Sequence, residues 1–202
     1  ATIPGSRSMP GAELALRVGE LAIGPHTHVV VHCAGRTRSI VGAKTLQLMG
    51  LPQTVALKNG TMGWMMAGYA LEHGSQRTML PEPGAEAGRE AAERAEVLAI
   101  AAGVRFLDVS ALDEIMASGE SRNVYLVDVR TREEFEAGHV PGFRWFAGGQ
   151  AVQRADEMMA VRAGEAVFCC DGMTRAAMTA GWFRRMGHPN VYAVAGGARA
   201  WT

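Results

Sequence analysis

Cysteine and arginine recur at a fixed spacing at two places in the chain. Cys33 is followed by Arg36 and Arg38. Cys170 is followed by Arg175, so four residues separate each cysteine from its last arginine. An apolar run typical of a buried strand precedes each cysteine, and a helix-like stretch follows each arginine. A thiol in such a turn faces backbone amides and the positive end of a helix dipole. This placement predicts a nucleophilic thiolate in an anion-binding loop.

The two loops belong to a longer internal repeat. Shifting the chain by 137 positions, the distance from Cys33 to Cys170, superimposes the loops without a gap. The same shift pairs residues with special backbone or packing roles, which is hard to explain by chance. The clearest further pairs are Pro4 with Pro141, Gly5 with Gly142, Met49 with Met186, Gly50 with Gly187, Gly60 with Gly197 and Trp64 with Trp201. The sequence therefore predicts two copies of one structural unit.

The second copy alternates short apolar runs with helical stretches. Strands are expected over 104–109, 124–129, 140–146, 166–170 and 191–195, and helices over 111–117, 132–137 and 176–186. Alternation of this kind predicts an α/β fold, with a parallel sheet flanked by helices on both faces. Such sheets bind their ligands at the carboxyl ends of the strands. Both cysteine loops follow a predicted strand at that end.

The first copy covers only the later part of the unit. Counterparts of the strands at 104–109 and 124–129 would precede residue 1, so we expect an incomplete first unit and a chain that is a piece of a longer protein. Turn and breaker residues at 74–84, and a helical pattern at 85–102, predict a linker and a connecting helix. The expected domains are a unit at 1–73 without its N-terminal strands, a linker and helix at 74–103, and a second unit at 104–202.

Composition narrows the classes of function. The chain has 20 basic and 20 acidic residues, so no net charge attracts nucleic acid or a membrane surface. No apolar run reaches the roughly 18 residues that a membrane span requires. Three cysteines make a disulfide framework improbable and favour the cytoplasm. His26 and His28 lack partners at ligand spacing, and no nucleotide-binding glycine loop is present, so neither metal nor cofactor is expected.

The loop pattern resembles a known family. A buried strand, then Cys-x-x-x-x-Arg-Ser, then a helix is similar to the active-site loop of the rhodanese sulfurtransferases. DVR at 128–130, EEF at 133–135 and GHVPG at 138–142 are similar to that family's signature for the first half of its domain. The segments at 60–64 and 196–201 resemble its closing glycine–tryptophan motif. Together these motifs extend over both copies, apart from the linker.

The resemblance implies an enzyme that moves sulfur through a cysteine persulfide. The Cys33 thiolate would take sulfur from a small anionic donor such as thiosulfate, and pass it to cyanide or a thiol without any cofactor. Substrate-binding residues carried over from the family are Ala34, Gly35, Arg36, Thr37 and Arg38, with Arg175 in the second copy. Backbone amides from Ala34 to Arg38 would stabilise the persulfide, and Arg36 and Arg38 would orient the donor. Arg38 could equally form a structural ion pair with a carboxylate of the absent half.

The second loop is expected to be a weaker site. The repeat aligns Cys170, rather than Cys169, with Cys33. Asp171 then replaces Ala34, and a methionine replaces the first arginine, so the positive charge of the loop is lost. An acidic neighbour disfavours both a thiolate and an anionic donor. We therefore interpret Cys170 as a secondary catalytic candidate and Cys169 as a buried strand thiol.

Two other functions fit parts of the pattern. Cysteine-dependent phosphatases and arsenate reductases have five residues between cysteine and arginine, whereas Cys33 and Arg38 are separated by four. A shorter loop makes a tighter cradle, which suits a sulfur atom better than a tetrahedral phosphate. The other alternative is a non-catalytic module that binds or regulates a partner, which the altered second loop favours.

Overall fold

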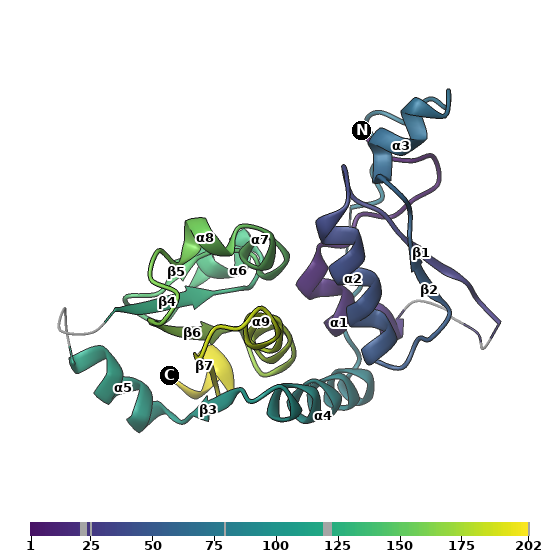
Figure 1. Ribbon diagram of the computed structural model, residues 1–202. Coiled ribbons are helices and arrows are strands. Elements are labelled where there is room, and N and C mark those ends of the chain that lie inside the picture. The colour runs from purple at the N-terminus through teal and green to yellow at the C-terminus, as the bar shows by residue number, and fades with distance from the viewer. Residues whose placement is uncertain (21–23, 25, 79, 119–122, 202) are drawn as a thin grey trace. The chain divides into compact units, whose positions relative to one another are not determined.

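The chain forms two compact units in a computed structural model that describes residues 1–20, 24, 26–78, 80–118 and 123–201 (Figure 1). Unit 1 comprises Ala1–Gly88 and unit 2 comprises Arg89–Thr202. The boundary falls within helix α4 (Ala85–Ala101), inside the range expected to hold the linker and the connecting helix. The finer domain limits at 73 and 104 stay predictions.

Unit 1 is built around a short parallel pair of strands. Strand β1 (Val29–Val31) pairs with β2 (Thr54–Ala56), and helix α2 (Thr37–Leu48) connects them. Helix α1 (Gly11–Arg17) packs on α2, and is followed by the 3₁₀ turn η1 (Val18–Glu20). A side chain at Gly42 of α2 would meet Leu14 at 3.0 Å and Val31 at 3.3 Å, so this glycine lets α2 approach both α1 and β1. Helix α3 (Gly60–Met66) follows β2.

Unit 2 contains a five-stranded parallel sheet in the order β3-β7-β6-β4-β5. Its strands are β3 (Arg105–Leu107), β4 (Val124–Asp128), β5 (Arg144–Trp145), β6 (Glu165–Cys169) and β7 (Asn190–Val194). At the 137-residue shift, β6 and β7 are the counterparts of β1 and β2. The register agrees, since Val29 pairs with Thr54 as Ala166 pairs with Val191. The repeat is therefore present in the backbone pairing as well as in the sequence.

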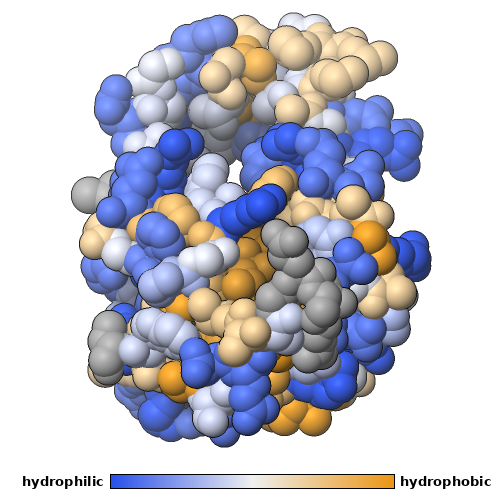
Figure 2. Space-filling view, turned by 90° about the vertical axis from the view of Figure 1, so that its left-hand side faces the viewer, coloured by the Kyte–Doolittle hydropathy of each residue, from blue (hydrophilic) through white to orange (hydrophobic). Residues whose placement is uncertain are grey.

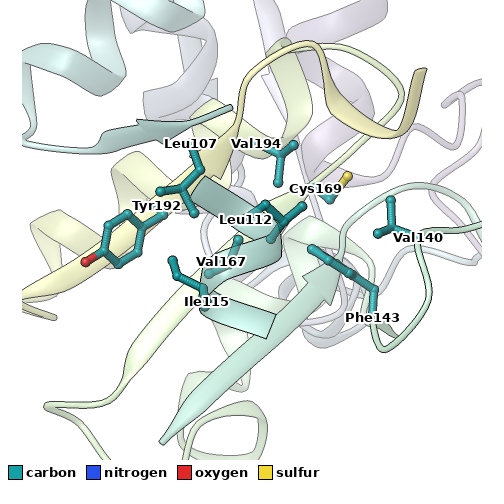
Figure 3. Packing of buried hydrophobic residues seen from close by; sticks show 9 residues of the cluster. All are labelled: Leu107, Leu112, Ile115, Val140, Phe143, Val167, Cys169, Tyr192 and Val194. Carbon is teal, nitrogen blue, oxygen red and sulfur yellow. The ribbon is translucent and has the colours of Figure 1, made fainter. Parts of the chain in front are cut away.

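Helices cover both faces of this sheet, which confirms the predicted α/β class. The remaining helices are α5 (Val109–Ala117), α6 (Arg132–Ala137), α7 (Gly148–Gln153), α8 (Ala155–Met158), α9 (Thr174–Arg185) and the 3₁₀ turn η3 (Gly197–Ala200). Leu112 and Ile115 of α5 join Val167 of β6 in a buried cluster (Figure 3). The next residue on the strand, Phe168, faces the other way and packs on Phe183 of α9, with ring centroids 4.8 Å apart. Alternate residues of β6 thus face opposite helical layers.

Local signals set where two of these helices begin. The Asp108 carboxylate accepts a hydrogen bond from the Ala111 amide at 2.8 Å and caps α5. Thr131 and Glu134 form a capping box at α6. Between these helices, at the end of β4, the buried Arg130 guanidinium donates to Asp128 and to the Gly138 carbonyl. The DVR motif therefore fixes the loop that follows β4, which is a packing role.

Several elements differ from the sequence-based expectations. The strand expected over 140–146 is only the two residues of β5, and the short helices α1, α7 and α8 were not expected. The end of the second unit at residue 202, and residues 119–122, lie outside the described part. Within that part, no helix is both long and apolar enough to cross a membrane. The face in Figure 2 is a mixture of hydrophilic and apolar residues.

Candidate active site

Cys33 lies between the end of β1 and the start of α2, as its place in the sequence predicts. It is half-buried, and the side chains of Ala34, Arg36 and Thr37 are exposed around it. Arg36 occupies the N-cap position of α2, so the loop leads directly into the helix amino terminus. Unpaired amides at this end favour a negative charge on the loop. The structure thus brings the predicted loop residues to the carboxyl end of the strand.

The surroundings of Cys33 stabilise its thiolate. Burial, the largest effect, raises the pKa of the Cys33 thiol, but several donors outweigh it and the pKa is lowered overall. The donors are the Ser39 hydroxyl and the backbone amides of Ser39 and Gly35, and the charge of Arg38 adds to them. In the neutral form the Cys33 thiol donates to Ser39 Oγ at 3.5 Å, and the Ser39 hydroxyl donates to the Arg36 carbonyl at 2.9 Å. Once the thiol ionises, the same hydroxyl can turn and donate to the sulfur. Ser39 was not among the predicted site residues, although it belongs to the Arg-Ser pair of the motif.

The amino end of α3 holds the carbonyl side of this loop. The Thr61 amide donates to the Cys33 carbonyl at 2.8 Å, and the Met62 amide donates to the Ala34 carbonyl at 3.1 Å. Gly60 makes this approach feasible, because its φ is +54° and a Cβ there would stand 2.0 Å from the Cys33 oxygen. With the carbonyls bonded to α3, the loop amides are free to face the sulfur. The closing glycine–tryptophan segment therefore acts as a clamp on the cysteine loop.

The same clamp holds the second loop. The Ala198 amide of η3 donates to the Cys170 carbonyl at 2.7 Å. Gly197 has a φ of +63°, and a Cβ there would stand 2.3 Å from the same oxygen. These contacts repeat those of Thr61 and Gly60 at the 137-residue shift. Cys170 thus occupies the backbone position of Cys33, as the repeat alignment indicates.

The environment of Cys170 is nevertheless the opposite of that of Cys33. Cys170 is fully buried, and burial followed by the charge of Asp171 raises its pKa to about 11. Cys169 is also buried, in the apolar cluster drawn in Figure 3, and burial followed by the neighbouring Cys170 raises its pKa far above the ordinary value. All three cysteines are free thiols. Only Cys33 combines solvent access with a lowered pKa.

Arg175 is enclosed by carboxylates. Its side chain has an exposed fraction of 0%, and two of its nitrogens donate to Glu134 at 2.7 and 2.6 Å. One of these nitrogens also donates to Asp171 at 2.6 Å. Although burial opposes it, the pair with Arg175 holds the pKa of Glu134 at about 2. This is the geometry of a structural ion pair between α6 and α9, and the substrate-binding role of Arg175 stays a prediction.

The contact partner of Arg175 was missed at the level of sequence. Glu134 lies within the EEF segment, 41 residues before Arg175, and no local periodicity links the two. At the 137-residue shift, Arg175 corresponds to Arg38, whereas the position that would correspond to Glu134 lies outside the sequence of this chain. The Nε atom of Arg38 is buried without a hydrogen-bond partner among the described residues. The described part of the chain contains no cluster of three or more potential metal-ligating side chains.

Comparisons with known proteins agree with this architecture. The thiosulfate sulfurtransferase from Pseudomonas aeruginosa is 46% identical in sequence, with a TM-score of 0.90, and the match covers 96% of this chain and 37% of that one. The uncharacterized protein YqhL of Bacillus subtilis is 33% identical over 81 residues, which are 40% of this chain and 62% of that protein. The chain therefore spans less than two thirds of either relative. A model of the rhodanese-like domain matches residues 1–67 and 108–202. The chain belongs to the rhodanese-like domain family.

Proposed function

We propose that this chain is part of a sulfurtransferase whose nucleophile is Cys33. The observation that carries the proposal is a half-exposed thiol with a lowered pKa, held in a loop of amide donors at the amino end of α2. The likeness to the thiosulfate sulfurtransferase of Pseudomonas aeruginosa supports it. The donor would be a small anion such as thiosulfate, and the acceptor would be cyanide or a thiol. The cytoplasmic location favoured by the cysteine content stays a prediction.

The reaction proceeds by two displacements at sulfur. The Cys33 thiolate attacks the outer sulfur of thiosulfate, the sulfur–sulfur bond of the donor breaks, and sulfite leaves with the bonding pair. The enzyme then carries a persulfide anion on Cys33. A nucleophilic acceptor attacks the terminal sulfur, the persulfide bond breaks, and the Cys33 thiolate is restored. No net oxidation of the protein occurs over the cycle.

Each loop residue has a distinct part in these steps. The backbone amides from Ala34 to Arg38 stabilise the negative charge of the persulfide. Arg36 is exposed next to the cysteine and attracts the anionic donor. Arg38 lowers the pKa of Cys33 through its charge, and either orients the donor or positions the loop through an ion pair. Neither metal nor organic cofactor has a part in this scheme.

Mass spectrometry of the intact protein tests the proposal. After incubation of the reduced chain with thiosulfate and removal of the excess, we expect the mass to increase by one sulfur atom. The Cys33→Ser variant should show no increase, and Cys170→Ser should behave as the unmodified chain does. Cyanide should then remove the sulfur and release thiocyanate. If the unmodified chain gains no sulfur, or if Cys33→Ser gains as much, Cys33 is not a sulfur acceptor.

The same variants separate the alternatives. A cysteine phosphatase or arsenate reductase would hydrolyse a phosphate ester, or reduce arsenate, in a reaction that depends on Cys33. A non-catalytic module would show neither that activity nor a gain of sulfur. The four-residue spacing between Cys33 and Arg38 favours sulfur transfer over phosphate chemistry.

A further inference from the structure

The two cysteine loops share a backbone clamp but differ in the residue after the cysteine. In the first loop this residue is Ala34, which is exposed and carries no charge. In the second it is Asp171, whose two carboxylate oxygens have separate partners. One accepts a hydrogen bond from Arg175 at 2.6 Å, and the other accepts one from Arg199 at 3.1 Å. Asp171 therefore links the first turn of α9 to η3, the two elements that flank the second loop.

These contacts place the Asp171 carboxylate against the Arg175 guanidinium group, where the loop would otherwise receive an anionic ligand. A sulfur donor such as thiosulfate would use its anionic oxygens to reach an arginine in the same way. Arg175 already shares its charge between Glu134 and Asp171. The carboxylates of Glu134 and Asp171 balance the guanidinium groups of Arg175 and Arg199. The second loop therefore has no net positive charge to attract a further anion. The first loop has no equivalent carboxylate at position 34.

We propose that Asp171 is an internal anion that keeps the second loop closed to anionic sulfur donors and keeps Cys170 unreactive. Sulfur then enters the chain at Cys33 alone. The complete burial of Cys170 agrees with this assignment, and so does the contribution of Asp171 to its high pKa. The statement about donors rests on the proposed function, whereas the statement about thiol reactivity does not depend on it.

Thiol alkylation measures the effect of Asp171 without a sulfur donor. In a Cys33→Ser background, the folded protein is treated with iodoacetamide, and the alkylation of Cys170 is followed by mass spectrometry of its peptide. Asp171→Ala, which introduces the residue of the first loop, should accelerate alkylation of Cys170 severalfold, because loss of the neighbouring carboxylate increases the thiolate fraction. Asp171→Asn keeps the size and removes the charge, and should also accelerate it. Cys169 should stay unreactive in all variants.

A matched control is Asp113→Ala on α5, which removes an exposed carboxylate of the same unit. It should leave the alkylation rate of Cys170 unchanged. Thermal unfolding verifies that each variant is folded at the temperature of the assay. If folded Asp171→Ala and Asp171→Asn proteins both alkylate Cys170 at the original rate, Asp171 does not silence the loop and the proposal fails.

The reciprocal exchange makes the complementary test in the first loop. Ala34→Asp places a carboxylate four residues before Arg38, as Asp171 stands before Arg175. Alkylation of Cys33 should then slow severalfold, because the carboxylate disfavours the thiolate, and the gain of sulfur from thiosulfate should be lost. An unchanged alkylation rate in folded Ala34→Asp would also contradict the proposal. If the unmodified chain accepts no sulfur but both alkylation effects appear, the proposed function fails while the role of Asp171 stands.

Discussion

At the scale of single residues, two cysteines at equivalent positions of the repeat differ in exposure and in the direction of their pKa shift. Cys33 and Cys170 follow equivalent strands and are held by equivalent amide contacts. Cys33 is half-exposed and has hydrogen-bond donors around its sulfur, whereas Cys170 is fully buried beside a carboxylate. Burial and a nearby negative charge both disfavour the thiolate. Reactivity therefore depends on a few neighbours rather than on the backbone of the loop.

The contribution of Ser39 can be measured by its removal. When Cys33 ionises, the Ser39 hydroxyl can turn from the Arg36 carbonyl to the sulfur, and this contact lowers the pKa of Cys33. Ser39→Ala should therefore raise that pKa and move the pH profile of alkylation to higher pH. At neutral pH the rate should fall by about tenfold, because a hydrogen bond to a charged group contributes roughly 1.5 kcal/mol or more.

The measurement is the rate of iodoacetamide alkylation of Cys33 as a function of pH. At high pH, where the thiol is ionised in both proteins, Ser39→Ala and the unmodified chain should react at similar rates. Equal rates at neutral pH would show that Ser39 does not stabilise the thiolate. Ser8→Ala, in an exposed position of the same unit, is the control and should leave the profile unchanged.

At the scale of elements, the site consists of strand β1, the cysteine loop and helix α2, and the amino end of helix α3 holds the loop in place. β1 supplies Cys33, α2 supplies the amino terminus that favours an anion, and α3 binds the loop carbonyls. Gly60 and Gly197 allow the following amides to reach the cysteine carbonyls, because a Cβ at either position would overlap the carbonyl oxygen. The repeat conserves this arrangement in both units of the molecule, although their loop side chains differ.

Replacement of Gly60 by alanine should disrupt the first loop. The positive φ alone costs about 1–2 kcal/mol, and the overlap with the Cys33 carbonyl adds to that, so unfolding of unit 1 by urea should occur at lower concentration. The displaced loop should also slow alkylation of Cys33. Gly68→Ala is a matched control, since Gly68 has a φ of +87° with nothing within 4 Å. It should lower stability through backbone strain alone and leave the reactivity of Cys33 intact. Equal reactivity in both variants would refute the clamp.

At the scale of the whole chain, equivalent strands have different surroundings. Val30 of β1 and Val55 of β2 have exposed fractions of 55% and 54%. Their counterparts in unit 2, Val167 and Tyr192, have exposed fractions of 0% and 9% and pack against α5. A two-stranded sheet with an uncovered apolar face is much less stable than a five-stranded sheet covered on both faces. Within this 202-residue chain, the two units should therefore differ in stability despite their common backbone.

Hydrogen exchange followed by mass spectrometry measures this difference. Amides of β6 and β7 should exchange more slowly than those of β1 and β2, by about a hundredfold or more, if the units differ by roughly 3 kcal/mol in opening free energy. Peptides from the two units are compared in one sample, so each serves as the control for the other. Similar protection in the paired strands would contradict the expectation.

Much of the architecture was predictable because it depends on local patterns. The strands before both cysteines, α5, α6 and α9 follow from apolar runs and helical periodicity, and the repeat indicated that Cys170 aligns with Cys33. The short helices α7 and α8 were not predictable in this way, because they begin without the side-chain cap that marks the start of the equally short α6. The bond between Arg175 and Glu134 joins positions 41 residues apart, and only the packing of α6 against the loop brings them together.

The sequence by itself determined that the chain contains two copies of a unit, each with a cysteine in the turn between a strand and a helix. These features depend on residue type and spacing, which any alignment of the chain with itself reveals. The charges of the two loops also favoured Cys33 over Cys170 at the level of sequence, but only the tertiary structure decided how buried each thiol is and which donors surround it. Ionisation of a thiol depends on its exposure and on the charges around it, and folding buries Cys170 while it leaves Cys33 half-exposed among donors.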